Sequence, residues 1–372
     1  APYRTPAIRA VRSFLGRVLP DQAALDPESS AVALSTGRSA ASRRLWHSSP
    51  MANVTWLPPT PGDGVFTRAE ALAQGHSDDQ LQAWVRQGRV RRLRPGIFAS
   101  GPAPDRADAR LLERAQGLAR RHPDRVAISH HAALLMHGVA VFGVPMGILH
   151  AVRLSGAPRS SPGLLLARPR TPPPTVTVHG AFVVRPEVAV VQVACLYGLN
   201  AGLVSADSAV HRGLVDTRSL ADEVGRIGCI PGVEKARRVV QLCRAGAESP
   251  GETLVRLAAE QAGLATQTQF PINDRGQPPF AFADLRVRGT RTLVEFDGAV
   301  KYAGAQGREA LVKEKLREDR IRRLGWTIER VVWRDLGDPQ ALQVRLLDAA
   351  QRGGSALDVS KEPNSDRNRS AS

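Results

Sequence analysis

The stretch that decides the fold of the C-terminal third is FAFADLRVRGTRTLVEFDGAVKY, residues 280–302. It predicts two β-strands, AFADLRV and TLVEFDG, because two apolar runs flank a turn at Arg288-Gly289-Thr290. Three carboxylates interrupt these runs: Asp284 in the first strand, and Glu295 and Asp297 in the second. Side chains two residues apart on a strand point to the same face, so we expect Glu295 and Asp297 to lie together.

Acidic side chains among apolar neighbours need a compensating charge. Burial of a carboxylate is costly unless a proton or a cation neutralises it. Carboxylate oxygens are the usual ligands of a hard divalent cation such as Mg²⁺ or Mn²⁺. The three carboxylates of the hairpin, Asp284, Glu295 and Asp297, therefore predict a site for a divalent metal.

Composition limits what such a site can serve. The chain has 372 residues, of which 42% are hydrophobic, enough for two or three domains with their own cores. Lysine and arginine number 51 against 35 acids, a net charge of +16 that favours a polyanionic partner such as DNA. The same excess of arginine is also typical of high-GC genomes. No stretch approaches the roughly 20 apolar residues of a membrane span, so no membrane partner is expected.

The three cysteines, Cys195, Cys229 and Cys243, are too far apart for a CxxC metal clip and suit a reducing, cytoplasmic environment. Residues 1–50 are rich in Arg, Ser and Ala, which we interpret as an extension upstream of a core beginning near Met51, or alternatively as a transit peptide. Disorder is predicted over residues 1–62. The polar tail, residues 353–372, is also predicted to be disordered.

Residues 63–101 predict a winged helix-turn-helix of the α+β class. Thr67 with Glu70, and Ser77 with Gln80, are capping boxes that open two short helices, and a two-strand hairpin follows. The second helix would offer Asp79, Gln80, Ala83 and Arg86 to a major groove, and a basic wing would offer Arg89, Arg91, Arg92 and Arg94 to phosphates. Such an outline also serves as a protein-docking module, so that alternative stays open.

The segments GVFTRAEALAQG, residues 64–75, and RRLRPGIFAS, residues 91–100, resemble the N-terminal winged helix of AbiEi-family antitoxins from type IV toxin–antitoxin systems. The resemblance implies DNA binding and transcriptional autoregulation, with a cognate toxin as a further partner. By similarity, Gln80, Arg86, Arg91 and Arg92 are the candidate DNA contacts, and Arg89 joins them from the basic wing.

Residues 102–246 predict a mixed α/β connector. Helices are expected at 107–121, 129–138, 188–197, 203–212 and 217–225, and strands at 147–154, 163–166 and 175–178. His130, His131 and His137 do not share one helical face, and no carboxylate stands at ligand spacing. We therefore expect a helix start there and no metal site.

Residues 247–352 begin with a helix whose N-cap is Ser249. Pro250 suits the first helical position, and Glu252 occupies the third position of a capping box. A capping role for Glu252 needs no catalysis, yet an acid here precedes the acidic hairpin. After the hairpin, a helix at about 308–324 carries seven basic and four acidic residues, which fit either a solvated face or a phosphate-binding face. A strand at 326–333 and a helix at 339–350 complete the region.

Four segments together resemble the PD-(D/E)xK endonuclease superfamily, and in particular its very-short-patch-repair branch. They are SPGETLVRLAAEQAGL, FADLRV, TLVEFDGAVKY and LREDRIRRLGWTIERVVWRDL, which span nearly all of residues 249–352. The resemblance implies an α/β restriction-endonuclease-like domain with a mixed sheet. It also implies that Asp284 is the first-strand acid, Glu295 the second-strand acid and Glu252 the helical acid, with Mg²⁺ or Mn²⁺ as cofactor.

The sequence departs from the superfamily at the position of its lysine. Two residues after Glu295 stands Asp297, so Lys301, Lys313 or Lys315 would have to supply the positive charge. We assign the catalytic set as Glu252, Asp284, Glu295, Asp297 and Lys301. Two hypotheses follow: a DNA endonuclease that uses a divalent cation, or an antitoxin-type regulator whose nuclease-like domain is inactive. The sequence leaves the oligomeric state open.

Overall fold

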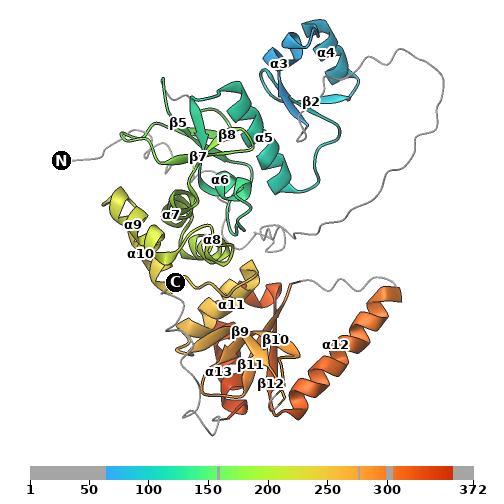
Figure 1. Ribbon diagram of the computed structural model, residues 1–372, viewed down its shortest axis with the longest axis vertical. Coiled ribbons are helices and arrows are strands. Elements are labelled where there is room, and N and C mark those ends of the chain that lie inside the picture. Colours follow the sequence, from blue (N-terminus) through green and yellow to red (C-terminus); the bar gives the residue numbers. More distant parts are fainter. Residues whose placement is uncertain (1–63, 157–159, 275–276, 299–304, 355–372) are drawn as a thin grey trace. The chain divides into compact units, whose positions relative to one another are not determined.

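The described residues divide after Cys243 into an N-terminal and a C-terminal unit (Figure 1). The computed structural model describes residues 64–156, 160–274, 277–298 and 305–354, and the side chains of its penultimate α-helix from residue 312 on. Both units combine helices with mixed sheets, in agreement with the expected α+β and α/β class. The predicted extension 1–62, nearly all of the predicted tail and Lys301 lie outside the described residues.

The N-terminal unit begins with a small three-stranded sheet and two short helices. The elements are β1 (Val65–Thr67), α3 (Arg68–Ala73), α4 (Asp78–Arg86), β2 (Val90–Arg94) and β3 (Ile97–Ser100), with strand order β1-β3-β2 and all pairs antiparallel. The two predicted capping boxes are present: the side chains of Thr67 and Ser77 accept from the third helical N–H, and their backbone N–H groups donate to the side chains of Glu70 and Gln80. Trp84 and Leu81 of α4 pack on Phe66 and Phe98 in a buried core.

A five-stranded mixed sheet follows, in the order β6-β5-β4-β8-β7. Its strands are β4 (Val126–Ile128), β5 (Leu149–Arg153), β6 (Leu164–Ala167), β7 (Thr175–Val178) and β8 (Ala181–Val184). Helices α5 (Ala107–Arg121) and α6 (His130–Met136) accompany it, and α5 matches its predicted bounds. Sequence reasoning missed β4 and β8, which are only three and four residues long.

Four helices complete this unit: α7 (Pro186–Tyr197), α8 (Leu199–His211), α9 (Thr217–Ile227) and α10 (Val233–Leu242). Helix α7 is apolar on most sides, and seven of its residues are buried. The chain turns from α7 to α8 at Gly198, whose φ of 103° is a conformation that other residues rarely adopt. No helix in the described ranges has the length and apolarity to cross a membrane.

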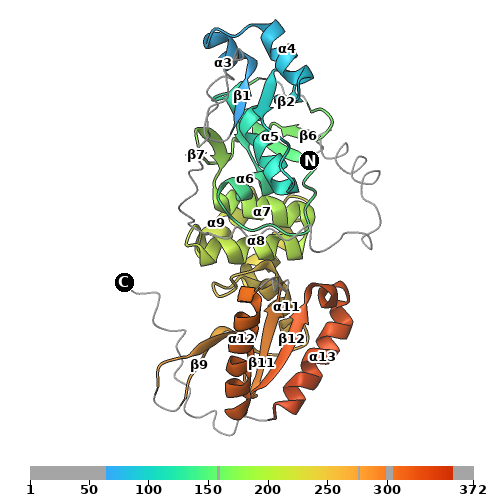
Figure 2. The same cartoon turned by 90° about the vertical axis from the view of Figure 1, so that its right-hand side faces the viewer.

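The C-terminal unit is a four-stranded mixed sheet with helices on both faces (Figure 2). Its elements are α11 (Pro250–Gln261), β9 (Thr266–Ile272), β10 (Ala281–Val287), β11 (Thr292–Asp297), α12 (Ala305–Arg323), β12 (Thr327–Val332), the 3₁₀ helix η2 (Trp333–Gly337) and α13 (Pro339–Arg352). Strands β9, β10 and β11 pair antiparallel, and β12 pairs parallel to β11. The predicted hairpin is therefore confirmed at β10 and β11.

Two apolar clusters cover the two faces of this sheet. Helices α11 and α13 bury Val255 and Leu346 against Leu285, Val287 and Val294. On the other face, Ile321 of α12 packs with Ala281, Ala283 and Leu293. Along β10 the buried side chains thus change from one cluster to the other between Ala283 and Leu285. Asp284 occupies this change of face, and Gln269, at the facing position of β9, has a φ of 47°.

Candidate acidic site

Helix α11 delivers Glu252 to the sheet. Ser249 accepts from the N–H of Glu252 at 3.2 Å, so the predicted N-cap is present. Gly251, the residue before Glu252, lies so close to the ring of Phe296 on β11 that a Cβ at position 251 would overlap the ring. Because van der Waals overlap of this kind forces the backbone apart, glycine at 251 lets the start of α11 approach the second strand.

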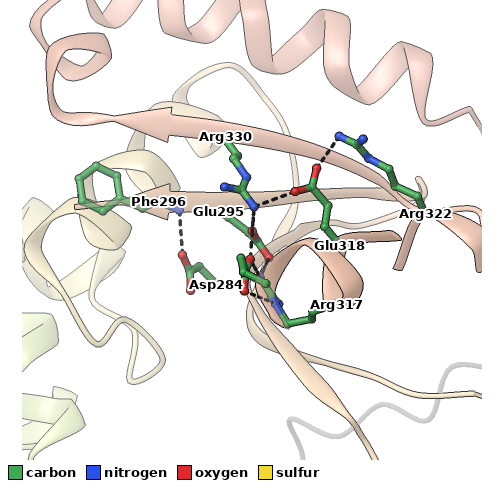
Figure 3. Close-up of polar contacts among 8 residues, drawn as sticks. Asp284, Glu295, Phe296, Arg317, Glu318, Arg322 and Arg330 are labelled. Carbon is green, nitrogen blue, oxygen red and sulfur yellow. Dashed lines mark hydrogen bonds and ion pairs between the residues drawn. The ribbon is translucent and has the colours of Figure 1, made fainter. Parts of the chain in front are cut away.

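The carboxyl of Asp284 is half-buried between α11 and β11. Its Oδ2 accepts from the backbone N–H of Phe296 at 2.8 Å (Figure 3). Burial, and secondarily the charge of Glu252, raises the pKa of Asp284 to about 7, and the charge of Glu295 acts in the same direction. Opposing contributions come from the Phe296 N–H and from Arg317. Asp284 therefore interacts electrostatically with two of the three other predicted acids, Glu252 and Glu295.

Glu252 does not complete the predicted capping box. Its Oε2 accepts from the N–H of Glu248 at 2.9 Å and from Nε2 of Gln269 at 3.3 Å, so it turns away from the N–H of Ser249. Burial raises its pKa. Neither Glu252 nor Asp284 forms an ion pair with a described residue, and these two acids are the uncompensated part of the cluster.

Glu295 has a different environment, because two arginines point toward it (Figure 3). Nη2 of Arg317, on α12, donates to Oε1 of Glu295 at 2.9 Å. Nη2 of Arg330 lies 3.9 Å from its Oε2, and Arg330 occupies the position directly opposite Glu295 on the parallel neighbour β12. The side chain of Glu295 is 12% exposed, so water only partly screens its ion pair with Arg317.

The remaining predicted catalytic residues do not join this group in the described part of the chain. Asp297 is half-exposed at the end of β11, and Lys313 and Lys315 are exposed on α12. Sequence reasoning missed three neighbours of the acids: Gln269, Arg317 and Arg330. Arg317 was one of seven basic residues on its helix, and only the packing of α12 on the sheet distinguishes it from the others.

The donor set suits a hard divalent cation. Among the described residues, no three or more His, Cys, Asp or Glu side chains form a group that could hold a metal ion as they stand. Mg²⁺, however, is commonly held by one or two carboxylates together with water and substrate phosphates. Asp284 and Glu295 extend from adjacent antiparallel strands, and the charge of Glu295 acts on the pKa of Asp284, so the chemistry of these two oxygen donors suits such a two-carboxylate site.

The predicted DNA-contacting residues separate into two groups. Arg86, Arg89 and Arg92 are exposed around the end of α4 and along β2. Arg91 is instead clamped: its guanidinium makes two bonds to Glu113 of α5, at 2.7 and 3.1 Å, and Nε bonds the carbonyl of Gly101. The amide oxygen of Gln80 accepts from the N–H of Ser77 at 2.8 Å, so that atom serves the helix cap.

A second titratable cluster lies in the N-terminal unit. His130 and His150 stack with ring centroids 4.3 Å apart, His131 lies edge-on to His150 at 5.6 Å, and His150 Nε2 is 2.7 Å from the hydroxyl of Tyr197. Burial lowers the pKa of all three histidines, that of His131 to about 4 and that of His150 to about 3. His130 begins α6 with a φ of 56°. The cluster is a set of neutral bases inside the core.

Comparison with known proteins finds relatives of low sequence identity. No protein-family model matches the chain. Two curated Mycobacterium tuberculosis proteins, described as uncharacterized proteins MT2308 and Rv2248, are each 26% identical over 291 residues, covering 74% of this chain and 98% of their own. Among solved structures, the M. tuberculosis protein RV2827C aligns with 14% identity and a TM-score of 0.34 over 52% of this chain and 75% of its own.

Proposed function

We propose that the C-terminal unit hydrolyses phosphodiester bonds in DNA with the help of a divalent cation. One observation carries the proposal: Glu252, Asp284 and Glu295 come from three adjacent elements, and burial, together with the charges of Glu252 and Glu295, raises the pKa of Asp284 to about 7. Acids that are buried together and left without full compensation are typical of functional sites. Their order along the chain is the one that the resemblance to PD-(D/E)xK endonucleases implies.

Asp284 and Glu295 are the ligands in this proposal. Mg²⁺ or Mn²⁺, when bound, supplies charge that polarises the scissile phosphate and lowers the pKa of an attacking water. The Phe296 N–H orients the carboxyl of Asp284 through Oδ2, so Asp284 would hold the ion together with Glu295. Glu252, whose own pKa is raised, stands beside Asp284 as the acid suited to accept a proton from water.

The N-terminal elements from β1 to β3 are the proposed DNA reader. We infer a winged helix in which Arg86, Arg89 and Arg92 contact phosphates, because all three are exposed on adjoining elements. Arg91 is left out of this set, because Glu113 neutralises it. The net charge of +16 adds a long-range attraction to DNA that salt would screen.

The direct test is nicking of supercoiled plasmid by the purified full-length chain with Mg²⁺, Mn²⁺ or a chelator. We expect metal-dependent conversion to open circles, which Asp284→Asn and Glu295→Gln abolish while binding to the same DNA is retained. Conversion no faster than in the chelated control, on both intact and mismatched plasmid, would refute the nuclease proposal.

A second function has its own support: an antitoxin-type regulator whose C-terminal unit binds without cutting. Asp297 stands where the superfamily has lysine, and Arg317 already neutralises Glu295. This reading predicts salt-dependent binding to DNA, by fluorescence anisotropy, with no cleavage under any metal condition. A cognate toxin would then be the partner to seek.

A further inference from the structure

Arg317 is held between the acidic site and its own helix. Its Nε and Nη2 donate to the two carboxylate oxygens of Glu314, one turn earlier on α12, at 2.9 and 2.7 Å. The same Nη2 donates to Glu295 at 2.9 Å. A bidentate bond of this type fixes the plane of the guanidinium, which a lysine ammonium cannot achieve.

The surrounding charges form a balanced network that includes Glu295. Arg330 bridges Glu314 and Glu318 at 3.2 and 3.0 Å, and Arg322 pairs with Glu318 at 2.6 Å. Three arginines thus face three glutamates, namely Glu295, Glu314 and Glu318. A divalent cation that takes Oε1 of Glu295 as a ligand would therefore compete with the hydrogen bond from Arg317.

One face of Arg317 remains available. Its side chain is 27% exposed, and Nη1 makes no hydrogen bond to any described residue. Arginine binds phosphate oxygens in the same forked geometry that it uses for carboxylates. A guanidinium displaced from Glu295, but still anchored by Glu314, would stay beside the acids with donors to offer.

We propose that Arg317 is the counter-ion of Glu295 in the absence of metal, and that a divalent cation replaces it there. The released guanidinium then binds the phosphodiester, in the role of the superfamily's lysine, whose position Asp297 occupies in this chain. This inference rests on the proposed nuclease function. It makes Arg317 a residue with two opposed effects, because it competes with the metal before substrate binds and assists afterwards.

The opposed effects can be measured separately. Calorimetric titration of the full-length chain with Mn²⁺ reports metal affinity without DNA, and plasmid nicking at saturating Mn²⁺ reports the second role. For Arg317→Met we expect roughly 10-fold tighter Mn²⁺ binding and 10- to 100-fold slower nicking, the range seen when outer partners of a metal site are removed. Arg317→Lys, which keeps the charge but not the fork, should fall between.

Arg323→Met is the matched control, because Arg323 is exposed on the same helix and its Nε donates to the backbone carbonyl of Asp319, outside the network of Glu295. It should leave both measurements unchanged. If Arg317→Met binds Mn²⁺ no more tightly than the wild type, the inference is wrong even where the wild type cuts DNA. If the wild-type protein neither binds Mn²⁺ nor nicks DNA, the proposed function itself is refuted. If Arg317→Lys and Arg317→Met are folded but both bind Mn²⁺ more weakly than the wild type, Arg317 has a structural role only and the inference is wrong.

Discussion

The two units each bury a group of titratable side chains, but the groups are of opposite kind. In the N-terminal unit His130, His131 and His150 are neutral bases in contact: His130 stacks on His150, and His131 lies edge-on to His150. In the C-terminal unit Asp284 and Glu252 are acids whose neutral forms are favoured by burial. The acidic group differs in that an arginine, Arg317, donates a hydrogen bond to one of its carboxylates, Glu295. Burial is thus common to both groups, and the charged hydrogen-bond partner is the feature on which our proposal rests.

The largest expected effect separates the two groups by activity. Asp284→Asn should lower the rate of plasmid nicking by more than the 10- to 100-fold that loss of an outer-shell partner costs. His131→Leu should leave the rate unchanged, because His131 is fully buried in the other unit. Rates within threefold of one another for wild type and Asp284→Asn would remove the acids from catalysis.

A pair of glycines sharpens the comparison through stability. Gly251→Ala should destabilise the C-terminal unit by about 1–3 kcal/mol, because its Cβ overlaps the Phe296 ring. At Gly225, within helix α9 of the N-terminal unit, an added Cβ would meet no atom within 4 Å. Because glycine is less favourable than alanine inside a helix, Gly225→Ala should stabilise that unit by roughly 0.5–1 kcal/mol. Urea unfolding followed by hydrogen exchange in each unit measures both. Equal, small effects would contradict the close approach.

Acid should act on the two units in opposite directions. The pKa of His131 falls from 6.5 to about 4 on folding, so its contribution is present above pH 6.5 and is lost as the pH drops toward 4, on the order of 3 kcal/mol. The pKa of Asp284 rises to about 7 on folding, so its contribution is present at pH 4 and is lost as the pH rises through 7.

Hydrogen exchange between pH 5 and pH 8 follows each unit in the intact chain. We expect protection in the N-terminal unit to fall toward pH 5 and protection in the C-terminal unit to fall toward pH 8. Asp284→Asn, which cannot ionise, should flatten the C-terminal profile and leave the N-terminal one as it was. Parallel profiles for both units would contradict the assigned environments.

The smallest effect concerns the basic strand β2. Arg92→Ala should weaken DNA binding a few-fold and reduce the salt dependence by about one phosphate contact. Arg91→Ala should barely change that salt dependence, and should instead cost about 1 kcal/mol of stability, because it breaks the bonds to Glu113. Anisotropy titrations at several salt concentrations distinguish them. A larger salt effect from Arg91 than from Arg92 would reverse the assignment.

Local sequence patterns predicted the elements that carry the acids. Strands β10 and β11 and the Ser249 cap follow from alternation, a glycine turn and capping chemistry. Strand β9, TQTQFPI, was missed because it is polar and contains a proline. Gln269 of this strand, which donates a hydrogen bond to Glu252, was therefore missed as well.

The arginines at the site could not be predicted, because their positions depend on pairing between distant segments. Arg330 reaches Glu295 because β12 pairs parallel to β11. Arg317 reaches Glu295 because α12 packs on the sheet, on the face that carries Ala283 and Leu293. No local periodicity distinguishes either residue from the other basic side chains nearby. The histidine cluster was missed for the same reason: β5 brings His150 to the start of α6.

The most direct measurement is titration of the full-length chain with Mn²⁺ in a calorimeter, beside Asp284→Asn. Our account predicts a saturable heat for the wild type that disappears in Asp284→Asn while the fold, followed by hydrogen exchange, is retained. No heat with the wild type, or the same heat with Asp284→Asn, would contradict the claim that these carboxylates from adjacent strands hold a divalent cation.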